Sequence, residues 1–154
     1  MSLKLKVEVN TREHFSVYGL KQLAFSVESR WFAGACRVNT YELDELLGTK
    51  LRALYQRKQG RDLFDMATAL KDCTGADPAR VVSAFQQYME HEGHNVTRAQ
   101  FEQNLALKLQ DPEFMADISP LLAPEYAWDP KGEAAVLSSQ LIERLPGESW
   151  KGER

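Results

Sequence analysis

The sequence has few of the residues that mark several common protein classes. Only two of its 154 residues are cysteines, Cys36 and Cys73, and they lie far apart, so neither a disulfide framework nor a paired-cysteine metal site is expected. No apolar run approaches the length of a membrane span, and no signal-type segment opens the chain. These absences predict a cytoplasmic protein with reduced thiols and no membrane association.

What is present is ordinary globular composition with an uneven distribution of charge. Apolar residues make up 44% and charged residues 27%, in a chain long enough to bury a core without metals or disulfides. Residues 1–80 hold 13 Lys+Arg against 10 Asp+Glu, whereas residues 81–154 hold 6 against 12. A basic first half suits an anionic ligand such as a nucleotide or RNA, although a difference of this size is also ordinary scatter.

The first 39 residues predict a small sheet. Residues 3–9 alternate strictly between apolar and polar side chains, which is typical of a strand with one buried face. Two more strands are predicted over residues 22–29 and 34–39. Such a sheet needs a helical cover, and its first strand has an edge that favours pairing with a second copy.

From Thr40 onward the apolar period changes to that of helices. Thr40 is a candidate N-cap, and Asp77 before Pro78 and Thr97 are others. Helices are predicted over residues 40–58, 61–73, 78–91, 97–109, 111–122 and 131–145. The sequence therefore predicts an α+β protein, with about three N-terminal strands and then a helical bundle, divided into residues 1–58 and 59–154.

The stretch 48–65 concentrates the charge of the first half. Lys50 and Arg57 are seven residues apart, so they lie on nearly the same side of the predicted helix. The apolar face beside them is predicted to anchor this helix to the sheet; its members are Leu51, Leu54 and Tyr55. The other charged residues of the stretch are Arg52, Lys58, Arg61, Asp62 and Asp65.

These residue types suit a triphosphate site. A lysine supplies a mobile point charge, arginines supply bidentate forks, and the helix start near Arg61 favours a phosphate. Glu8, between two valines on the first predicted strand, is a compact candidate ligand for Mg²⁺. The same pattern also fits a solvated basic face in which Arg61 and Asp65, spaced i,i+4, form a local ion pair.

The stretch also resembles the signature of the AbiEii/AbiGii-type nucleotidyltransferase toxins of type IV toxin–antitoxin and abortive-infection systems. The family pattern is a lysine, Ala-Leu, an arginine, then Arg-Asp, two spacers and an aspartate. Here it reads Lys50, Ala53-Leu54, Arg57, Arg61-Asp62 and Asp65. The upstream segment KLKVEVNTRE is similar to the family's acidic strand, with Glu8 in the acidic position, and HEGHNVTRAQFEQNLALKLQDPEF resembles its helical C-terminal portion.

The resemblance implies Mg²⁺-assisted transfer of a nucleotidyl group from a nucleoside triphosphate to an acceptor such as tRNA. It implies that the N-terminal strands are the remnant of a nucleotidyltransferase sheet and that a cognate antitoxin is a partner. By the same resemblance, Glu8 is the third metal carboxylate. Lys50, Arg57 and Arg61 support phosphates, and Lys50, Asp62 and Asp65 are the catalytic candidates.

One motif of the superfamily is missing. It opens with Gly-Gly or Gly-Ser followed by an Asp-x-Asp pair, and the sequence contains neither. The chain is therefore expected to be the C-terminal portion of a toxin, with little or no transferase activity alone. The alternatives are a non-catalytic module that assembles with an antitoxin or with itself, and a basic RNA-binding surface with steep salt dependence.

Overall fold

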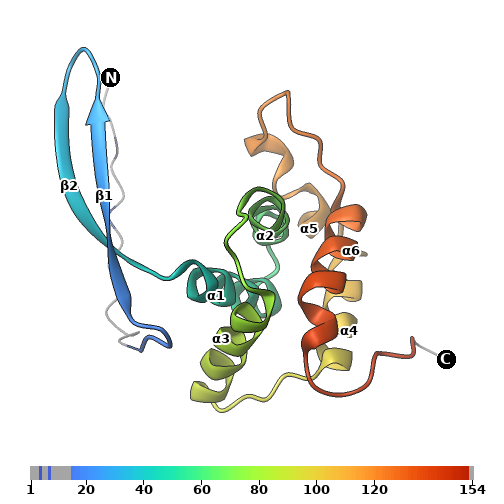
Figure 1. Ribbon diagram of the computed structural model, residues 1–154. Coiled ribbons are helices and arrows are strands. Elements are labelled where there is room, and N and C mark those ends of the chain that lie inside the picture. Colours follow the sequence, from blue (N-terminus) through green and yellow to red (C-terminus); the bar gives the residue numbers. More distant parts are fainter. Residues whose placement is uncertain (1–3, 5–6, 8–14, 153–154) are drawn as a thin grey trace.

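The computed structural model describes Lys4, Val7 and residues 15–152, and this part is a β-hairpin followed by a bundle of helices (Figure 1). The hairpin stands to one side of the bundle, and helix α1 joins the two. This arrangement confirms the α+β class with the sheet first. The described part contains two strands where about three are predicted. The predicted strand 3–9 lies outside the described residues, apart from Lys4 and Val7, whose side chains are exposed.

The hairpin consists of β1 (Leu20–Glu28) and β2 (Ala33–Tyr41), which pair antiparallel. Its loop is closed by Ser29, whose amide donates to the carbonyl of Phe32 at 2.9 Å. Because side chains alternate across a strand, the hairpin has one apolar face, and its members are between 40% and 55% exposed. They are Leu23, Phe25, Val27 and Val38.

Six α-helices and two short 3₁₀ turns follow the hairpin in the described part. The helices are α1 (Leu43–Gln56), α2 (Gly60–Asp72), α3 (Pro78–His91), α4 (Arg98–Lys108), α5 (Pro112–Ala116) and α6 (Pro130–Gln140); the 3₁₀ turns are η1 (Ser119–Leu121) and η2 (Ile142–Arg144).

Local signals explain where several helices begin. Asp77 accepts a hydrogen bond from the amide of Ala79 before α3, and Thr97 forms a capping box with Gln100 before α4. The prediction of Thr40 as an N-cap is wrong, because Thr40 lies in β2 and the N-cap position of α1 is Glu42. The strand continues past Thr40 because the pairing with β1 extends to Tyr41.

The core lies between the helices. Leu51 and Leu54 of α1 are fully buried there with Phe85 and Phe101, and Tyr55 packs against the same two rings. The prediction that this face of α1 anchors the sheet is therefore wrong, because the bundle itself buries it. The division of the chain after residue 58 stays a prediction.

A buried carboxylate holds the base of the hairpin on the bundle. Glu45 of α1 accepts hydrogen bonds from the amides of Val17 and Tyr18 at 2.7 and 2.8 Å, and from the hydroxyls of Ser16 and Tyr88 at 3.1 and 2.7 Å. The segment before β1 is thereby fixed to α1 and α3.

Candidate functional site

The candidate residues gather where α1 ends and α2 begins. A Cβ atom on Gly60, the first residue of α2, would collide with the carbonyl oxygen of Phe114 in α5. The requirement for glycine at this position comes from the closeness of α5. It does not come from the backbone conformation, because Gly60 is not in the left-handed region. The amide of Arg61 donates to the carboxylate of Asp117 at 3.1 Å, which satisfies one of the free amides at the start of α2.

Lys50 and Asp65 form an ion pair across the two helices. Nζ of Lys50 lies 2.7 Å from Oδ2 of Asp65, and the two side chains are 38% and 45% exposed. Exposed pairs of this kind contribute about 0.2–1 kcal/mol, so an incoming anion can compete with Asp65 for the lysine at small cost.

Arg57 and Asp62 form a second pair with very different exposure. Nε of Arg57 lies 3.7 Å from Oδ2 of Asp62; the arginine side chain is 57% exposed and the aspartate side chain 4%. Burial raises the pKa of Asp62, whereas the charges of Arg57 and Lys50 oppose this rise. Oδ2 of Asp62 has no hydrogen-bond partner among the described residues. The exposed guanidinium therefore lies at the surface of the joint, with the buried carboxylate of Asp62 behind it.

The remaining cations of the stretch pair with aspartates further along the chain. Nη1 of Arg61 lies 3.9 Å from Asp117, and Lys58 pairs with Asp111. The suggested local pair between Arg61 and Asp65 is not the contact made, since Asp65 binds Lys50 instead.

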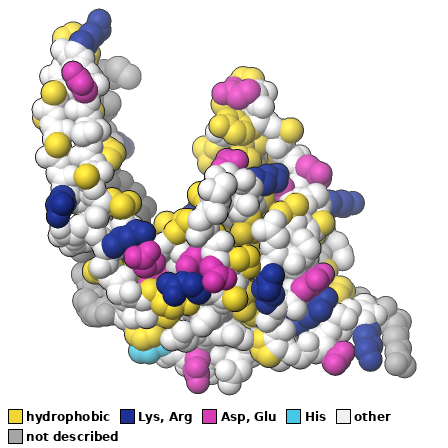
Figure 2. Space-filling view, in the orientation of Figure 1, with side chains coloured by type: hydrophobic (Ala, Val, Ile, Leu, Met, Phe, Trp, Pro, Cys, Tyr) yellow, Lys and Arg dark blue, Asp and Glu magenta, His cyan; other side chains and the backbone are white. Residues whose placement is uncertain are grey.

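A groove of about 340 Å³ lies on the same side of α1 as Lys50 and Arg57. Arg52 also lines it, but this arginine pairs with Glu92 at 2.9 Å and lies over the ring of Tyr88. The groove reaches Tyr41 at the end of β2, so its far wall is the base of the hairpin. Figure 2 shows a deep notch between the hairpin and the bundle, with basic and acidic side chains close together below it.

The candidate metal ligand Glu8 lies outside the described residues. In the described part of the chain, no three His, Cys, Asp or Glu side chains come together in a way that could hold a metal ion. Of the two carboxylates of the motif, Asp65 is paired with Lys50 and Asp62 is buried.

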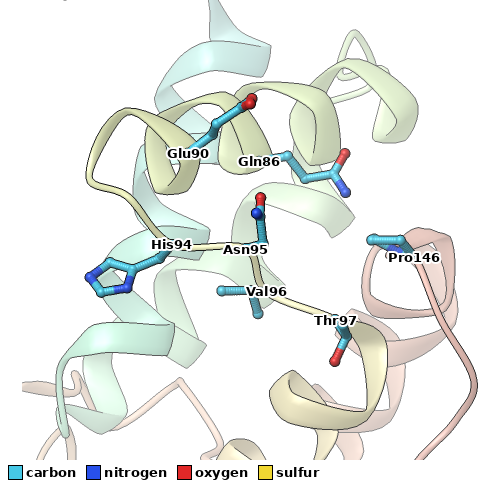
Figure 3. A pocket seen from close by; sticks show the side chains of 7 residues that line it. All are labelled: Gln86, Glu90, His94, Asn95, Val96, Thr97 and Pro146. Atoms are coloured by element: carbon cyan, nitrogen blue, oxygen red, sulfur yellow. The ribbon is translucent and has the colours of Figure 1, made fainter.

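A second hollow of about 260 Å³ lies away from this joint (Figure 3). The side chain of His94 points away from Pro146 there, and no residue of the stretch 48–65 lines this hollow. Its lining residues are Gln86, Glu90, His94, Asn95, Val96, Thr97 and Pro146.

Sequence reasoning missed one charged residue next to the joint. Lys108 of α4 is only 7% exposed, and its ammonium donates to the carbonyl of Tyr55 at 2.8 Å and to that of Leu54. A single lysine in a predicted helix gives no sign of burial, because lysine side chains are mostly exposed in folded proteins. Its role follows only from the packing of α4 against the end of α1.

A small sheet followed by a helical bundle defines an α+β protein, and at the joint between α1 and α2 three cations, Lys50, Arg57 and Arg61, are paired with aspartates. The family model for the nucleotidyl transferase AbiEii toxin of type IV toxin–antitoxin systems matches residues 2–134, and the chain belongs to this family. Comparison with curated proteins and with solved structures gives no match. No helix in the described part of the chain is long and apolar enough to cross a membrane.

Proposed function

We propose that the joint between α1 and α2 binds the phosphates of a nucleoside triphosphate and supports nucleotidyl transfer to an acceptor such as tRNA. The observation that carries this proposal is the shared placement of Lys50 and Arg57 on one groove, where each of them also pairs with an aspartate of α2. Membership in a nucleotidyltransferase toxin family supports the reaction class.

Each residue has a distinct part in this proposal. Lys50 moves away from Asp65 and neutralises a phosphate. Arg57 faces Asp62 with its Nε atom, so the two terminal nitrogens of its guanidinium can donate to phosphate oxygens. Asp62 orients that guanidinium and Asp65 returns the lysine to its resting position. Arg61, which is 44% exposed at the start of α2, adds a further charge.

Mg²⁺ is proposed to enter with the nucleotide. When bound, such a metal stabilises the attacking and leaving oxygens during transfer. Glu8 remains the proposed protein ligand, and phosphate oxygens would supply others. Asp62 and Asp65 are assigned no metal contact, because their present partners are cations.

The chain alone is proposed to transfer nucleotides poorly. The sequence lacks the Gly-Ser and Asp-x-Asp motif that supplies the other two metal carboxylates in the superfamily. Binding of the triphosphate is the part of the function that the groove supports. We further propose that the protein binds a cognate antitoxin and that it acts in the cytoplasm.

Calorimetric titration with each of the four ribonucleoside triphosphates and Mg²⁺ tests the proposal. Lys50→Ala is expected to weaken binding about tenfold, which corresponds to the loss of one charge-assisted phosphate contact of about 1.5 kcal/mol. Lys21→Ala is a matched control. Lys21 forms an ion pair with Glu42 at 2.8 Å, and the two side chains are 37% and 41% exposed, which is similar to the pair of Lys50 and Asp65, but Lys21 lies in the hairpin. Binding that is absent in the wild type, or equal in both variants, would contradict the proposal.

The exposed apolar face of the hairpin favours a second candidate, self-assembly through that face. Leu23, Phe25 and Val38 offer about half of their surface to solvent, which is unusual for neighbouring residues in a monomer. Light scattering should then report a dimer that Phe25→Lys disrupts. Ala24→Lys, on the opposite face of β1, should leave the dimer intact. A wild-type protein that is monomeric at all concentrations would exclude this candidate.

A further inference from the structure

The loop of the hairpin presents two large aromatic side chains to solvent. Trp31 is 80% exposed and Phe32 65%, and no other large apolar side chain in the described part of the chain is as exposed as Trp31. The loop lies at the end of the hairpin that points away from the bundle (Figure 1). Because burial of such rings is strongly favourable, two adjacent aromatic side chains that stay this exposed are typical of a surface that binds a partner.

Hydrogen bonds hold the backbone of this loop in one conformation. The hydroxyl oxygen of Ser29 accepts from the amides of Trp31 and Phe32 at 3.3 and 3.1 Å, and the same hydroxyl donates to the carbonyl of Phe32 at 3.1 Å. The ring of Phe32 lies over Gly34, where a Cβ atom would come within 2.7 Å of it. A loop that is ordered before binding loses less entropy when a partner binds.

The charge beside the rings favours an anionic partner. The guanidinium of Arg30 lies over the ring of Trp31, 4.2 Å from its centroid, which is a cation–π contact. Since Trp31 stays 80% exposed, Arg30 covers only part of the ring, and a flat group can still stack on the rest. Basic residues outnumber acids in the hairpin, whose charged residues are Lys21, Glu28, Arg30 and Arg37.

The arginines of the hairpin differ from the cations of the joint in their partners. The cations of the joint are paired with aspartates. Neither Arg30 nor Arg37 forms an ion pair with any residue that the structure describes. Arg30 can therefore bind a phosphate without first leaving a carboxylate, and a guanidinium suits phosphate oxygens well.

We propose that the loop of the hairpin binds single-stranded RNA, with an unpaired base stacked on Trp31 and a neighbouring phosphate bound by Arg30. Every base has a flat face that stacks on an aromatic ring, and loops and ends of RNA offer such bases unpaired. An apolar protein surface would suit the rings but would bury the charge of Arg30 without a partner, which is costly. Binding of RNA here does not depend on the proposed function; only the use of this RNA as nucleotide acceptor rests on it.

Fluorescence anisotropy of a dye-labelled single-stranded RNA of about twelve nucleotides and mixed sequence tests the stacking contact. Trp31→Ala should bind it at least about fivefold more weakly than the wild type, whereas Trp31→Phe, which keeps a flat ring, should retain most of the affinity. Tyr126→Ala removes another exposed aromatic side chain, outside the hairpin, and should bind as the wild type does. The same RNA paired with its complement should bind more weakly, because its bases are no longer free to stack.

The salt dependence of binding tests the phosphate contact. Arg30→Gln should reduce the slope of the logarithm of the binding constant against the logarithm of the salt concentration by about 0.7, the value for one phosphate contact on a single strand. Arg144→Gln is the matched control, because Arg144 lies in η2, where its Nε donates to the carbonyl of Gln140. This variant should keep the wild-type slope.

Several results would overturn the inference. They are equal affinities of Trp31→Ala and Tyr126→Ala with both folded by circular dichroism, equal affinities for single-stranded and duplex RNA, and equal salt slopes of the two arginine variants. If the wild type binds no RNA and Trp31→Ala abolishes a dimer in light scattering, the loop contacts protein instead.

The outcomes also separate this inference from the proposed function. Trp31 does not line the groove at the joint, so Trp31→Ala should bind a nucleoside triphosphate as the wild type does. A wild type that binds the triphosphate but no RNA would overturn the inference alone. A wild type that binds RNA but no triphosphate would overturn the proposed function alone.

Discussion

Replacing Glu45 by glutamine tests how the hairpin is held on the helices. The carboxylate of Glu45 is fully buried, and every one of its four partners can donate a hydrogen bond. The amides of Val17 and Tyr18 can only donate a hydrogen bond, because a backbone N–H group cannot accept one. In Glu45→Gln one of these amides would face the side-chain NH₂ group.

The expected cost follows from this mismatch. A buried donor left without a partner costs about 1–3 kcal/mol, and the loss of a charge-assisted bond adds about 1 kcal/mol, so we expect about 3 kcal/mol in total. For a chain of this length, about 1 kcal/mol lowers the melting temperature by about 2–4 °C, which gives a fall of about 6–12 °C. Urea denaturation followed by circular dichroism measures the free energy of unfolding directly.

Glu42→Gln is the matched control for this experiment. Glu42 precedes α1 and pairs with Lys21 at the surface, so its loss should cost less than about 1 kcal/mol. If Glu45→Gln unfolds at the same urea concentration as the wild type, the four hydrogen bonds do not hold the hairpin in solution.

Two further predictions concern other buried positions. Burial raises the pKa of Glu133 from 4.5 to about 7 although Lys71 opposes this, so ionisation costs stability as the pH rises through that window. Glu133→Gln should therefore unfold at higher urea concentration than the wild type at pH 8, with no advantage at pH 4; an equal advantage at both would contradict this. Gly60→Ala should lower the melting temperature because its methyl group meets the carbonyl of Phe114, whereas Gly75→Ala, in open space, should not. If Gly60→Ala melted at the same temperature as the wild type, α5 would have moved aside to accommodate the methyl group.

The positions of the helices could be predicted because their signals are local. Asp77 and Thr97 are caps whose partners lie two or three residues away. The limit of β2 could not be predicted, because it depends on where Tyr41 meets Leu20 across the hairpin. Thr40 has the chemistry of a cap, and the pairing with β1 overrides that preference.

In the candidate site, too, local features could be predicted from the sequence and long-range contacts could not. The seven-residue spacing of Lys50 and Arg57 correctly places both on one groove, because helical geometry is regular. The partners of these cations depend on the angle between α1 and α2, which no spacing reveals. Asp65 therefore pairs with Lys50, and Arg61 with Asp117, 56 residues further along the chain.

The arginine side chains themselves offer the most direct measurement of phosphate binding at the joint. NMR spectra of the arginine Nε–H groups, recorded during addition of a nucleoside triphosphate with Mg²⁺, report which guanidinium groups meet the ligand. The proposed function predicts that the signals of Arg57 and Arg61 shift together and saturate, while that of Arg144, in η2, stays in place. Shifts confined to Arg30 and Arg37 of the hairpin, or no shifts at all, would contradict a phosphate site between α1 and α2.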